Sequence, residues 1–352
     1  MTAKNAYILI ISAIVLSVIS LGILFTQNAF LFSYNNKIGK AILDNFAESD
    51  IREIKIVKPG GRSVNLIRNT DGQWSVGNYF NYPSDKEKVN NFLQELSSLK
   101  AVQVVNIEPS QLRALKLLPP SDKDKNSGTQ IRIIGTDKKE ICSLIAGVRR
   151  IDSLGASNIT RGRYILESDS KVPVLTEESL SETKYSAKEF LSSKFVVIKD
   201  IKKMQLTKGK DIIIWTILKK NQNAEFELYD KKKDDPDINI DNVYSVVSSL
   251  ESLKFDSVAN PSTAAETTGL DKPYTLSVET FSGDSFTINI GKQFNNYRYI
   301  KIDSSTFPLG KDWIYLIDNS RIAPFLQTKK DLSSKKRKFQ GAPDKIYSKP
   351  IG

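Results

Sequence analysis

The chain has 352 residues, a formal net charge of +11 and no histidine. Without histidine, Ser-His-Asp and Cys-His catalytic arrangements are excluded, and the commonest metal ligand is missing. The single cysteine, Cys142, excludes an internal disulfide and a zinc site built from cysteine and histidine. A hydrophobic content of 40% predicts a folded chain, and the length accommodates two domains of ordinary size.

The N-terminal region is uncharged and apolar. No charged residue occurs between Lys4 and Lys37, and residues 7–25 are almost wholly apolar. At 1.5 Å per residue this stretch matches a ~30 Å hydrocarbon core, and the small-x-small site of a cleavable signal peptide is poor. We therefore expect a stub at residues 1–6, a transmembrane anchor in contact with the lipid bilayer at residues 7–26, and a juxtamembrane linker at residues 27–48.

The anchor predicts a location. A six-residue stub beside a large C-terminal domain most often stays in the cytoplasm, whereas the positive charges on the two sides of the span are nearly balanced. The sequence therefore predicts a single-pass protein of a bacterial inner membrane, with the bulk of the chain outside the cytoplasm.

The rest of the chain contains an internal duplication, which is clearest in a predicted helix. Apolar residues at positions i, i+3, i+4, i+7 and i+10 form one helical face in each copy. These residues are Val89, Phe92, Leu93, Leu96 and Leu99 in the first copy, and Val243, Val246, Val247, Leu250 and Leu253 in the second. Ser84 with Glu87 predicts a capping box for the first helix, and Asp241 an N-cap for the second.

The segments around the helix recur as well. In each copy two strands precede the helix, and a strand pair that ends at a glycine follows it. The predicted strand segments are 50–56, 63–68 and 130–146 in the first copy, and 200–206, 212–218 and 275–290 in the second. A further strand opens at Arg163 in one copy and at Arg298 in the other. In the turn ahead of the strand pair, the first copy has Lys116 where the second has Gly269.

This order of elements predicts an α+β fold: an N-terminal transmembrane helix, then two duplicated units of mainly antiparallel sheet with packed helices. The expected boundaries are repeat unit 1 at 49–175, a helical connector at 176–191, repeat unit 2 at 192–328 and a basic tail at 329–352. The tail contains Lys335-Lys336-Arg337-Lys338, which could contact anionic lipid or an acidic partner surface, or simply be solvated. We expect no nucleic acid as a partner, because an exported domain does not meet it.

The search for reactive groups finds little. Cys142 lies in a predicted strand, where a small buried side chain is the common role. Ser-x-x-Lys pairs such as Ser97 and Lys100 lack the companion motifs of serine-lysine enzymes. Asp237-x-Asn239-x-Asp241 opens like a calcium loop but lacks its glycine and its glutamate. We therefore expect no catalytic, cofactor-binding or metal-ligating residue, and a protein that is not an enzyme.

The duplicated pattern resembles the DUF4340 family over about residues 45–330. The closest matches are Gly269-Leu270-Asp271-Lys272-Pro273 and Arg298-Tyr299-Ile300. The first copy departs from the Gly-Leu-x-x-Pro pattern at Lys116. The family offers no established catalytic residues to carry over. Several members resemble accessory subunits found beside ABC-type exporters of the gliding-motility type, and the resemblance implies such a role here.

Two functions from different classes follow. The first is a non-catalytic, membrane-anchored extracytoplasmic accessory protein that contacts an ABC-type permease, ATPase or auxiliary subunit. The second is a binding module or hydrolase for an envelope polysaccharide or another ligand, with Trp74, Tyr79, Phe80 and Tyr82 as candidate sugar platforms. The alternation of these aromatic residues places some of them in the core instead, and a hydrolase would need paired carboxylates in a cleft. We favour the first function.

Overall fold

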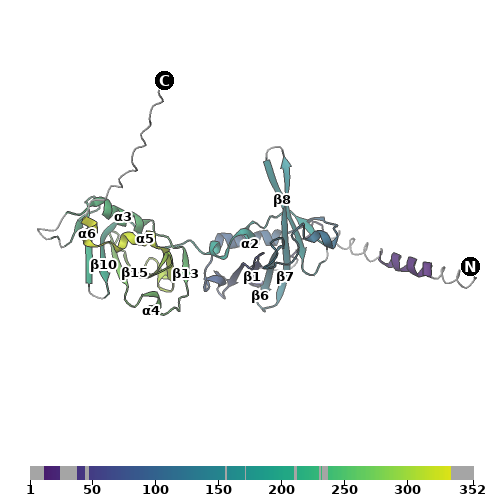
Figure 1. Ribbon diagram of the computed structural model, residues 1–352, viewed down its shortest axis with the longest axis horizontal. Helices are drawn as coiled ribbons and strands as arrows, with labels where there is room; N and C mark the ends of the chain where they lie inside the picture. The colour runs from purple at the N-terminus through teal and green to yellow at the C-terminus, as the bar shows by residue number, and fades with distance from the viewer. Residues whose placement is uncertain are drawn as a thin grey trace, which may run out of the picture. The chain divides into compact units, whose positions relative to one another are not determined.

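The computed structural model describes residues 12–23, 38–43, 47–154, 157–170, 172–209, 212–229, 231 and 237–333. The chain divides into two compact units: unit 1 ends at Ser193, and unit 2 begins at Lys194 (Figure 1). Each unit is built around one antiparallel sheet and one long helix.

In the described residues of unit 1, nine strands form one sheet in the order β4-β3-β2-β1-β6-β7-β8-β9-β5, and every pair is antiparallel. The strands are β1 (Ile51–Val57), β2 (Ser63–Arg68), β3 (Trp74–Val76), β4 (Tyr82–Pro83), β5 (Ala101–Val104), β6 (Thr129–Gly135), β7 (Glu140–Leu154), β8 (Ser157–Glu167) and β9 (Val174–Thr176). Alternate residues of β1, such as Ile54 and Ile56, are fully buried, so one face of the sheet lies on the core.

The long helix of unit 1 is α2 (Lys86–Ser98), and short 3-10 helices complete the unit. They are η1 (Glu48–Asp50), η2 (Gly77–Tyr79), η3 (Pro109–Leu112), η4 (Ser181–Lys184) and η5 (Ala187–Phe190). The predicted apolar face of α2 is buried, with Val89, Phe92 and Leu96 wholly inaccessible. Asp85, not Ser84, is the N-cap: its Oδ1 accepts from the backbone of Glu87 and Lys88 at 3.1 and 3.2 Å.

Unit 2 repeats the arrangement. Its described strands form an eight-stranded antiparallel sheet in the order β12-β11-β10-β14-β15-β16-β17-β13. They are β10 (Ile201–Lys208), β11 (Ile212–Leu218), β12 (Glu227–Leu228), β13 (Ser257–Ala259), β14 (Tyr274–Thr280), β15 (Ser285–Phe294), β16 (Tyr297–Ser304) and β17 (Ile314–Asp318). The helices are α3 (Ile240–Glu251), α4 (Ala265–Thr268), η6 (Pro308–Lys311), α5 (Asn319–Ile322), η7 (Ala323–Leu326) and α6 (Lys329–Ser333).

The helix α3 carries the second apolar face, and Val243 and Val246 are fully buried. Its N-cap is Asn239, whose Oδ1 accepts from the backbone nitrogen of Asp241 at 3.0 Å, so the predicted cap at Asp241 is wrong. At the start of the expected basic tail, α6 packs on α3 and buries Leu332. The cluster 335–338 lies outside the described residues.

The structure corrects the predicted fold class in two respects. The chain is mostly antiparallel sheet with few helices, and the expected helical connector at 176–191 forms only the short 3-10 helices η4 and η5. The expected transmembrane helix is also wrong: within the described residues, none of the helices has the length and apolar character needed to cross a membrane. Residues 12–23 are helical, which at 1.5 Å per residue is short against a ~30 Å core. The ends of the predicted span, 7–11 and 24–26, lie outside the described residues.

Candidate binding surface on unit 1

The two units differ most in one hairpin. In unit 2, the last pair of β15 and β16 is Phe294–Tyr297, and Phe294 lies three residues after Gly291. In unit 1 the equivalent strands β7 and β8 continue to the pair Leu154–Ser157. The extra length forms a two-stranded arm, residues 150–154 and 157–161, which projects from the body of the unit (Figure 1). At its base, Ile151 is 57% exposed.

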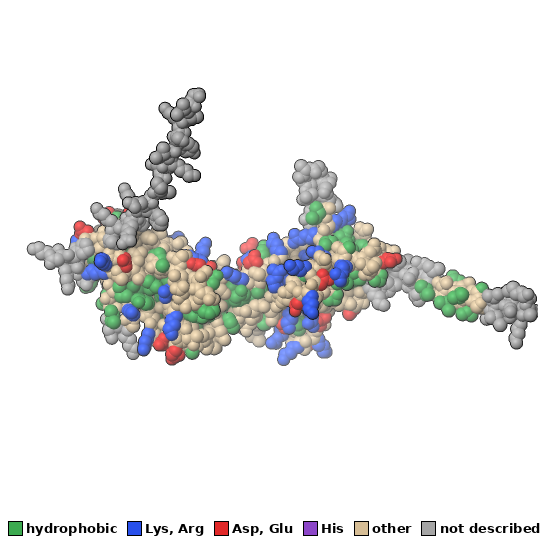
Figure 2. All heavy atoms as spheres, in the orientation of Figure 1, with side chains coloured by type: hydrophobic (Ala, Val, Ile, Leu, Met, Phe, Trp, Pro, Cys, Tyr) green, Lys and Arg blue, Asp and Glu red, His purple; other side chains and the backbone are tan. Residues whose placement is uncertain are grey.

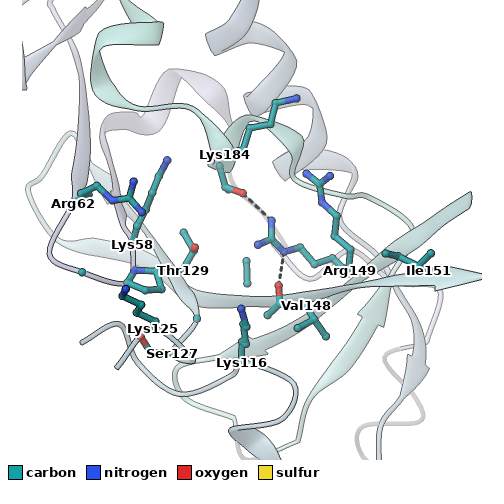
Figure 3. Close-up of a pocket in the computed structure, with 17 residues that line it drawn as sticks. Lys58, Arg62, Lys116, Lys125, Ser127, Thr129, Val148, Arg149, Ile151 and Lys184 are labelled. Atoms are coloured by element: carbon teal, nitrogen blue, oxygen red, sulfur yellow. Dashed lines mark hydrogen bonds between the residues drawn. The ribbon is translucent and has the colours of Figure 1, made fainter. Parts of the chain in front are cut away.

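A cleft of about 880 Å³ lies at the base of the arm. It is formed by the β1–β2 turn, the segment before β6, the middle of β7, one residue of β8 and the end of η4. Seven cationic side chains line it: Lys58, Arg62, Lys116, Lys125, Arg149, Arg163 and Lys184. Figure 3 labels six of these cations, all except Arg163, and they come from several sides of the cavity. No carboxylate of the described residues is among its lining.

The charge is visible on the surface. On the face that Figure 2 shows, Lys and Arg side chains gather over unit 1 below the arm. In the cleft, Lys58 is only 9% exposed, and its Nζ donates to the carbonyl oxygen of Tyr185. Burial, and then the neighbouring charge of Arg62, lower the pKa of Lys58, while Glu189 partly opposes this. The cavity therefore has a strongly positive potential.

Arg163 anchors the wall of the cleft. Its Nε donates to the carbonyl oxygen of Gly147 at 2.8 Å, and its Nη1 donates to Thr183 Oγ1 at 2.7 Å (Figure 3, dashed lines). Nη1 also reaches the carbonyl oxygens of Ser179 and Leu180 at 3.3 Å. Burial lowers the pKa of Arg163 to about 10, and the positive charge of Arg149 contributes. Two of the three guanidinium nitrogens of Arg163 therefore bind other residues of unit 1. The positive charge of Arg163 adds to the electrostatic potential of the cleft.

Lys116 occupies a strained backbone position. Its φ is +52°, in the left-handed region, and the equivalent Gly269 of unit 2 has a φ of +72°. The turn predicted from the repeat is therefore kept in unit 1 although the residue is not glycine. A side chain in this region costs about 1–2 kcal/mol relative to the right-handed form. Unit 1 tolerates that cost at Lys116, whose side chain lines the cleft.

A pair of carboxyl groups lies behind the cleft wall. Glu95 of α2 accepts from the backbone nitrogen of Ser181 at 2.9 Å, and Glu182 accepts from the hydroxyl of Ser181 at 2.9 Å. Burial raises the pKa of Glu95 to about 7, and the hydrogen bond and like charge of Glu182 add to the rise. The pair links α2 to η4, and neither carboxyl lines the cleft.

The other residues that the sequence singled out do not form a site. Trp74 and Tyr82 are core residues, whereas Phe80 is 44% exposed, so the four aromatic residues do not share one surface. Burial, with Glu167, Glu140 and Asp169 nearby, raises the pKa of the Cys142 thiol to about 12. Within the described residues, no group of histidine, cysteine, aspartate and glutamate is arranged to hold a metal ion.

The pattern of the sequence did not predict the cationic cleft. Its seven cations come from five separate segments between residues 58 and 184, and each one alone looks like an ordinary solvated charge. The one available signal was the repeat itself. Lys116 replaces the glycine of the second copy, and Arg149 stands where the second copy has Gln293.

These features define a class of protein: a duplicated, mainly antiparallel scaffold whose first unit carries an arm and a cationic cleft. A family model described as "Domain of unknown function (DUF4340)" matches residues 74–273, which is more than half of the chain. The chain belongs to the DUF4340 family. The match begins in β3 of unit 1 and ends just before β14 of unit 2, so it crosses the boundary between the units. Comparison with curated proteins and with solved structures found no match.

Proposed function

We propose that this chain is a non-catalytic accessory protein that acts by binding a partner, and that the partner belongs to an ABC-type export complex. The arm of unit 1 is the observation that carries the binding role. Two copies of one scaffold are present, and the copy in unit 2 forms a complete hairpin without this extension. The arm is therefore additional to what the fold requires.

The physical properties of the arm suit a contact with another protein. A two-stranded ribbon that leaves its sheet is only marginally stable by itself in water. A two-stranded ribbon has two outer edges, and a strand of another chain can add to such an edge. Ile151, exposed at its base, adds apolar surface that a partner would cover.

The structure offers less support for a hydrolase. Glycoside hydrolysis needs two carboxyl groups on either side of the bond that is cleaved. Glu95 and Glu182 do lie close together, but they bind the backbone and hydroxyl groups of residues 179–181, outside the lining of the cleft. The identity of the partner class rests on the likeness to family members found beside ABC-type exporters.

Co-purification tests the proposal. The tagged full-length chain is extracted from its native cells in mild detergent, and the associated chains are identified by mass spectrometry. Recovery of an ABC permease and ATPase in stoichiometric amounts is the expected result. A chain that is repeatedly recovered alone would count against the accessory role and would favour the alternative of a ligand-binding module.

The role of the arm is tested with a shortened variant. Residues 152–159 are replaced by Asn-Gly, which closes the pair Ile151–Thr160 with a two-residue turn. The variant is expected to keep the unfolding temperature of the wild type and to lose the partner. If the trimmed chain recovers the same partner in the same amount, the arm is not the binding element.

A further inference from the structure

The cations of the cleft differ from the other cations of unit 1 in their ion pairs. None of the seven forms an ion pair with a carboxylate in the part of the chain that the structure describes. Elsewhere in unit 1 the pattern is different. Cations outside the cleft that do pair with acidic residues are Lys55, Lys88, Arg113, Arg132 and Lys139. The cleft therefore concentrates positive charge, which Glu189 offsets in part at Lys58 and Glu95 offsets in part at Arg163.

This concentration works against the folded state. Like charges inside a partly buried cleft repel one another more strongly than they do in water. Burial lowers the pKa of Lys58 and of Arg163, and the neighbouring charges of Arg62 and Arg149 lower them further. An anion in the cleft would offset this repulsion, so the cluster of cations suits the binding of an anion better than the stabilisation of the fold.

Unit 2 shows that the scaffold does not need these charges. At the positions of Lys116 and Arg149, unit 2 has Gly269 and Gln293. The bond from arginine to the glycine carbonyl is kept in both units, as Arg163 to Gly147 and Arg298 to Gly291. The shared arginine is therefore structural, while the cations found only in unit 1 are additions to a fold that forms without them.

The lining indicates the chemistry of the ligand. Among the described residues no aromatic ring lines the cleft, and nucleobases are commonly held by stacking on such rings. Four of the seven cations are lysines, which act as point charges and suit tetrahedral phosphate oxygens. Arginine forks match phosphate as well as carboxylate, and two nitrogens of Arg163 are already occupied, so the lysines with Arg62 and Arg149 are the groups available to an anion. A volume of about 880 Å³ admits several charged groups.

We propose that the unit 1 cleft binds a flexible chain of phosphate groups. Arg62, Lys116, Lys125 and Arg149, which are exposed or half-buried, contact the phosphates, and Lys184, whose ammonium group lies over the ring of Tyr185, borders the cleft. Lys58 and Arg163 lie deeper, and their hydrogen bonds keep them from reorienting toward a ligand. Their positive charges contribute to the electrostatic potential of the cleft. This site goes beyond the partner-binding role of the arm, and it does not depend on the identity of that partner.

Calorimetric titration of the full chain with sodium tripolyphosphate tests the proposal. We expect one site per chain, with binding that weakens by about tenfold between ~50 and ~200 mM salt. Inorganic phosphate is expected to bind at least about tenfold more weakly, because it meets fewer of the cations. Polyglutamate of matched charge that binds as tightly as tripolyphosphate would overturn the assignment to phosphate.

The variant Lys116→Gly/Arg149→Gln transfers the residues of unit 2 into unit 1. It is expected to weaken tripolyphosphate binding by about tenfold while keeping or raising the unfolding temperature. The matched control, Lys203→Gln/Lys311→Gln, removes the same net charge from exposed ion pairs of unit 2. Equal affinity of the wild type and the cleft variant, or an equal loss in the control, would overturn the site.

Vesicles distinguish the two sources of phosphate. Binding to vesicles of phosphatidylglycerol and phosphatidylcholine that tripolyphosphate displaces, and that the cleft variant loses, would identify lipid headgroups as the source. Binding of tripolyphosphate without binding to these vesicles would identify a soluble phosphate chain. Either result supports the site, and tripolyphosphate binding that survives undiminished in the cleft variant contradicts it.

Discussion

Arg163 and Arg298 occupy equivalent positions in the two units and bind the carbonyl oxygens of equivalent glycines. Arg163 Nε lies 2.8 Å from Gly147 O, and Arg298 Nη1 lies 3.0 Å from Gly291 O. In both units the strand register shifts at this point, so the glycine carbonyl falls outside the regular ladder. The arginine supplies the donor that the neighbouring strand does not.

Removal of this donor should therefore destabilise unit 2. Arg298→Met leaves the carbonyl of Gly291 without its charged donor, and we expect the free energy of unfolding to fall by about 1–3 kcal/mol. Lys301→Met, an exposed substitution on the same strand, is the control and should change it by less than about 0.5 kcal/mol. Denaturant unfolding measures both, and equal effects would mean that the bond contributes nothing specific.

At the strained turn of Lys116, we expect a substitution to raise the stability of the chain. Lys116→Gly relieves a left-handed conformation and removes one charge from the cationic cleft, so stability should rise by about 0.5 kcal/mol. Lys125→Gly also removes a cleft charge, but from a residue with ordinary backbone, and the added chain entropy should leave stability unchanged or lower. Thermal unfolding compares the two, and a loss of stability in Lys116→Gly would refute the strain.

The reverse change belongs to unit 2. A Cβ at Gly269 would lie 2.5 Å from Cγ of Lys292, at a φ of +72°. We expect Gly269→Lys to lower the free energy of unfolding by about 1–2 kcal/mol. Lys116→Gly and Gly269→Lys together test whether the turn conformation favours glycine in both units.

The carboxyl pair behind the cleft predicts a pH dependence. Because the pKa of Glu95 is raised from 4.5 to about 7, the folded chain holds this proton more tightly than the unfolded chain. Stability contributed by the protonated group is complete below about pH 4.5 and is lost as pH rises through about 7. Arg163 faces the pair and moderates the loss, since its charge and that of Glu95 attract.

Glu95→Gln imitates the protonated form at every pH. At pH ~5 it should match the wild type, and at pH ~8 it should be more stable by about 1 kcal/mol, a reduced figure because Glu95 is partly exposed. Glu87→Gln, at an exposed position of the same helix, is the control. Unfolding curves at both pH values decide: a constant difference between wild type and Glu95→Gln would show that the pair does not titrate in this range.

The buried helix face provides a test of the core. Leu96→Ala removes a side chain with no exposed surface, and we expect a loss of about 3 kcal/mol. Gln94→Ala on the exposed face of the same helix should change stability by less than about 0.5 kcal/mol. A small effect at Leu96 would mean that the helix packs loosely on the sheet.

These elements differ in how far the sequence determined them. The faces of α2 and α3 and the bounds of β2 follow from periodicity within a few residues, and the structure has them at the predicted places. The helix caps were misassigned because several neighbouring residues can accept the same bonds, and the backbone selected Asp85 and Asn239. The fold class was wrong because short polar segments were counted as helices and an apolar stretch as a span.

The cleft could not be found in the same way. Its walls come from the β1–β2 turn, the middle of β7 and η4, and the convergence of Lys58, Arg149 and Lys184 depends on the folded sheet. Periodicity reports on neighbours along the chain, whereas a surface site is defined by neighbours in space. The arm was not predicted for another reason. The duplication is recognised from the residues that both copies share, whereas the arm occurs only in unit 1.

The most direct test of the binding role uses crosslinking in living cells. A photoreactive phenylalanine analogue replaces Ile151 at the base of the arm, and in a second strain it replaces Phe294 on the short hairpin of unit 2, where the side chain is 47% exposed. We predict an adduct of defined mass from position 151, containing a subunit of an ABC-type complex, and none from position 294. The same adducts from both positions, or none from position 151, would contradict the account.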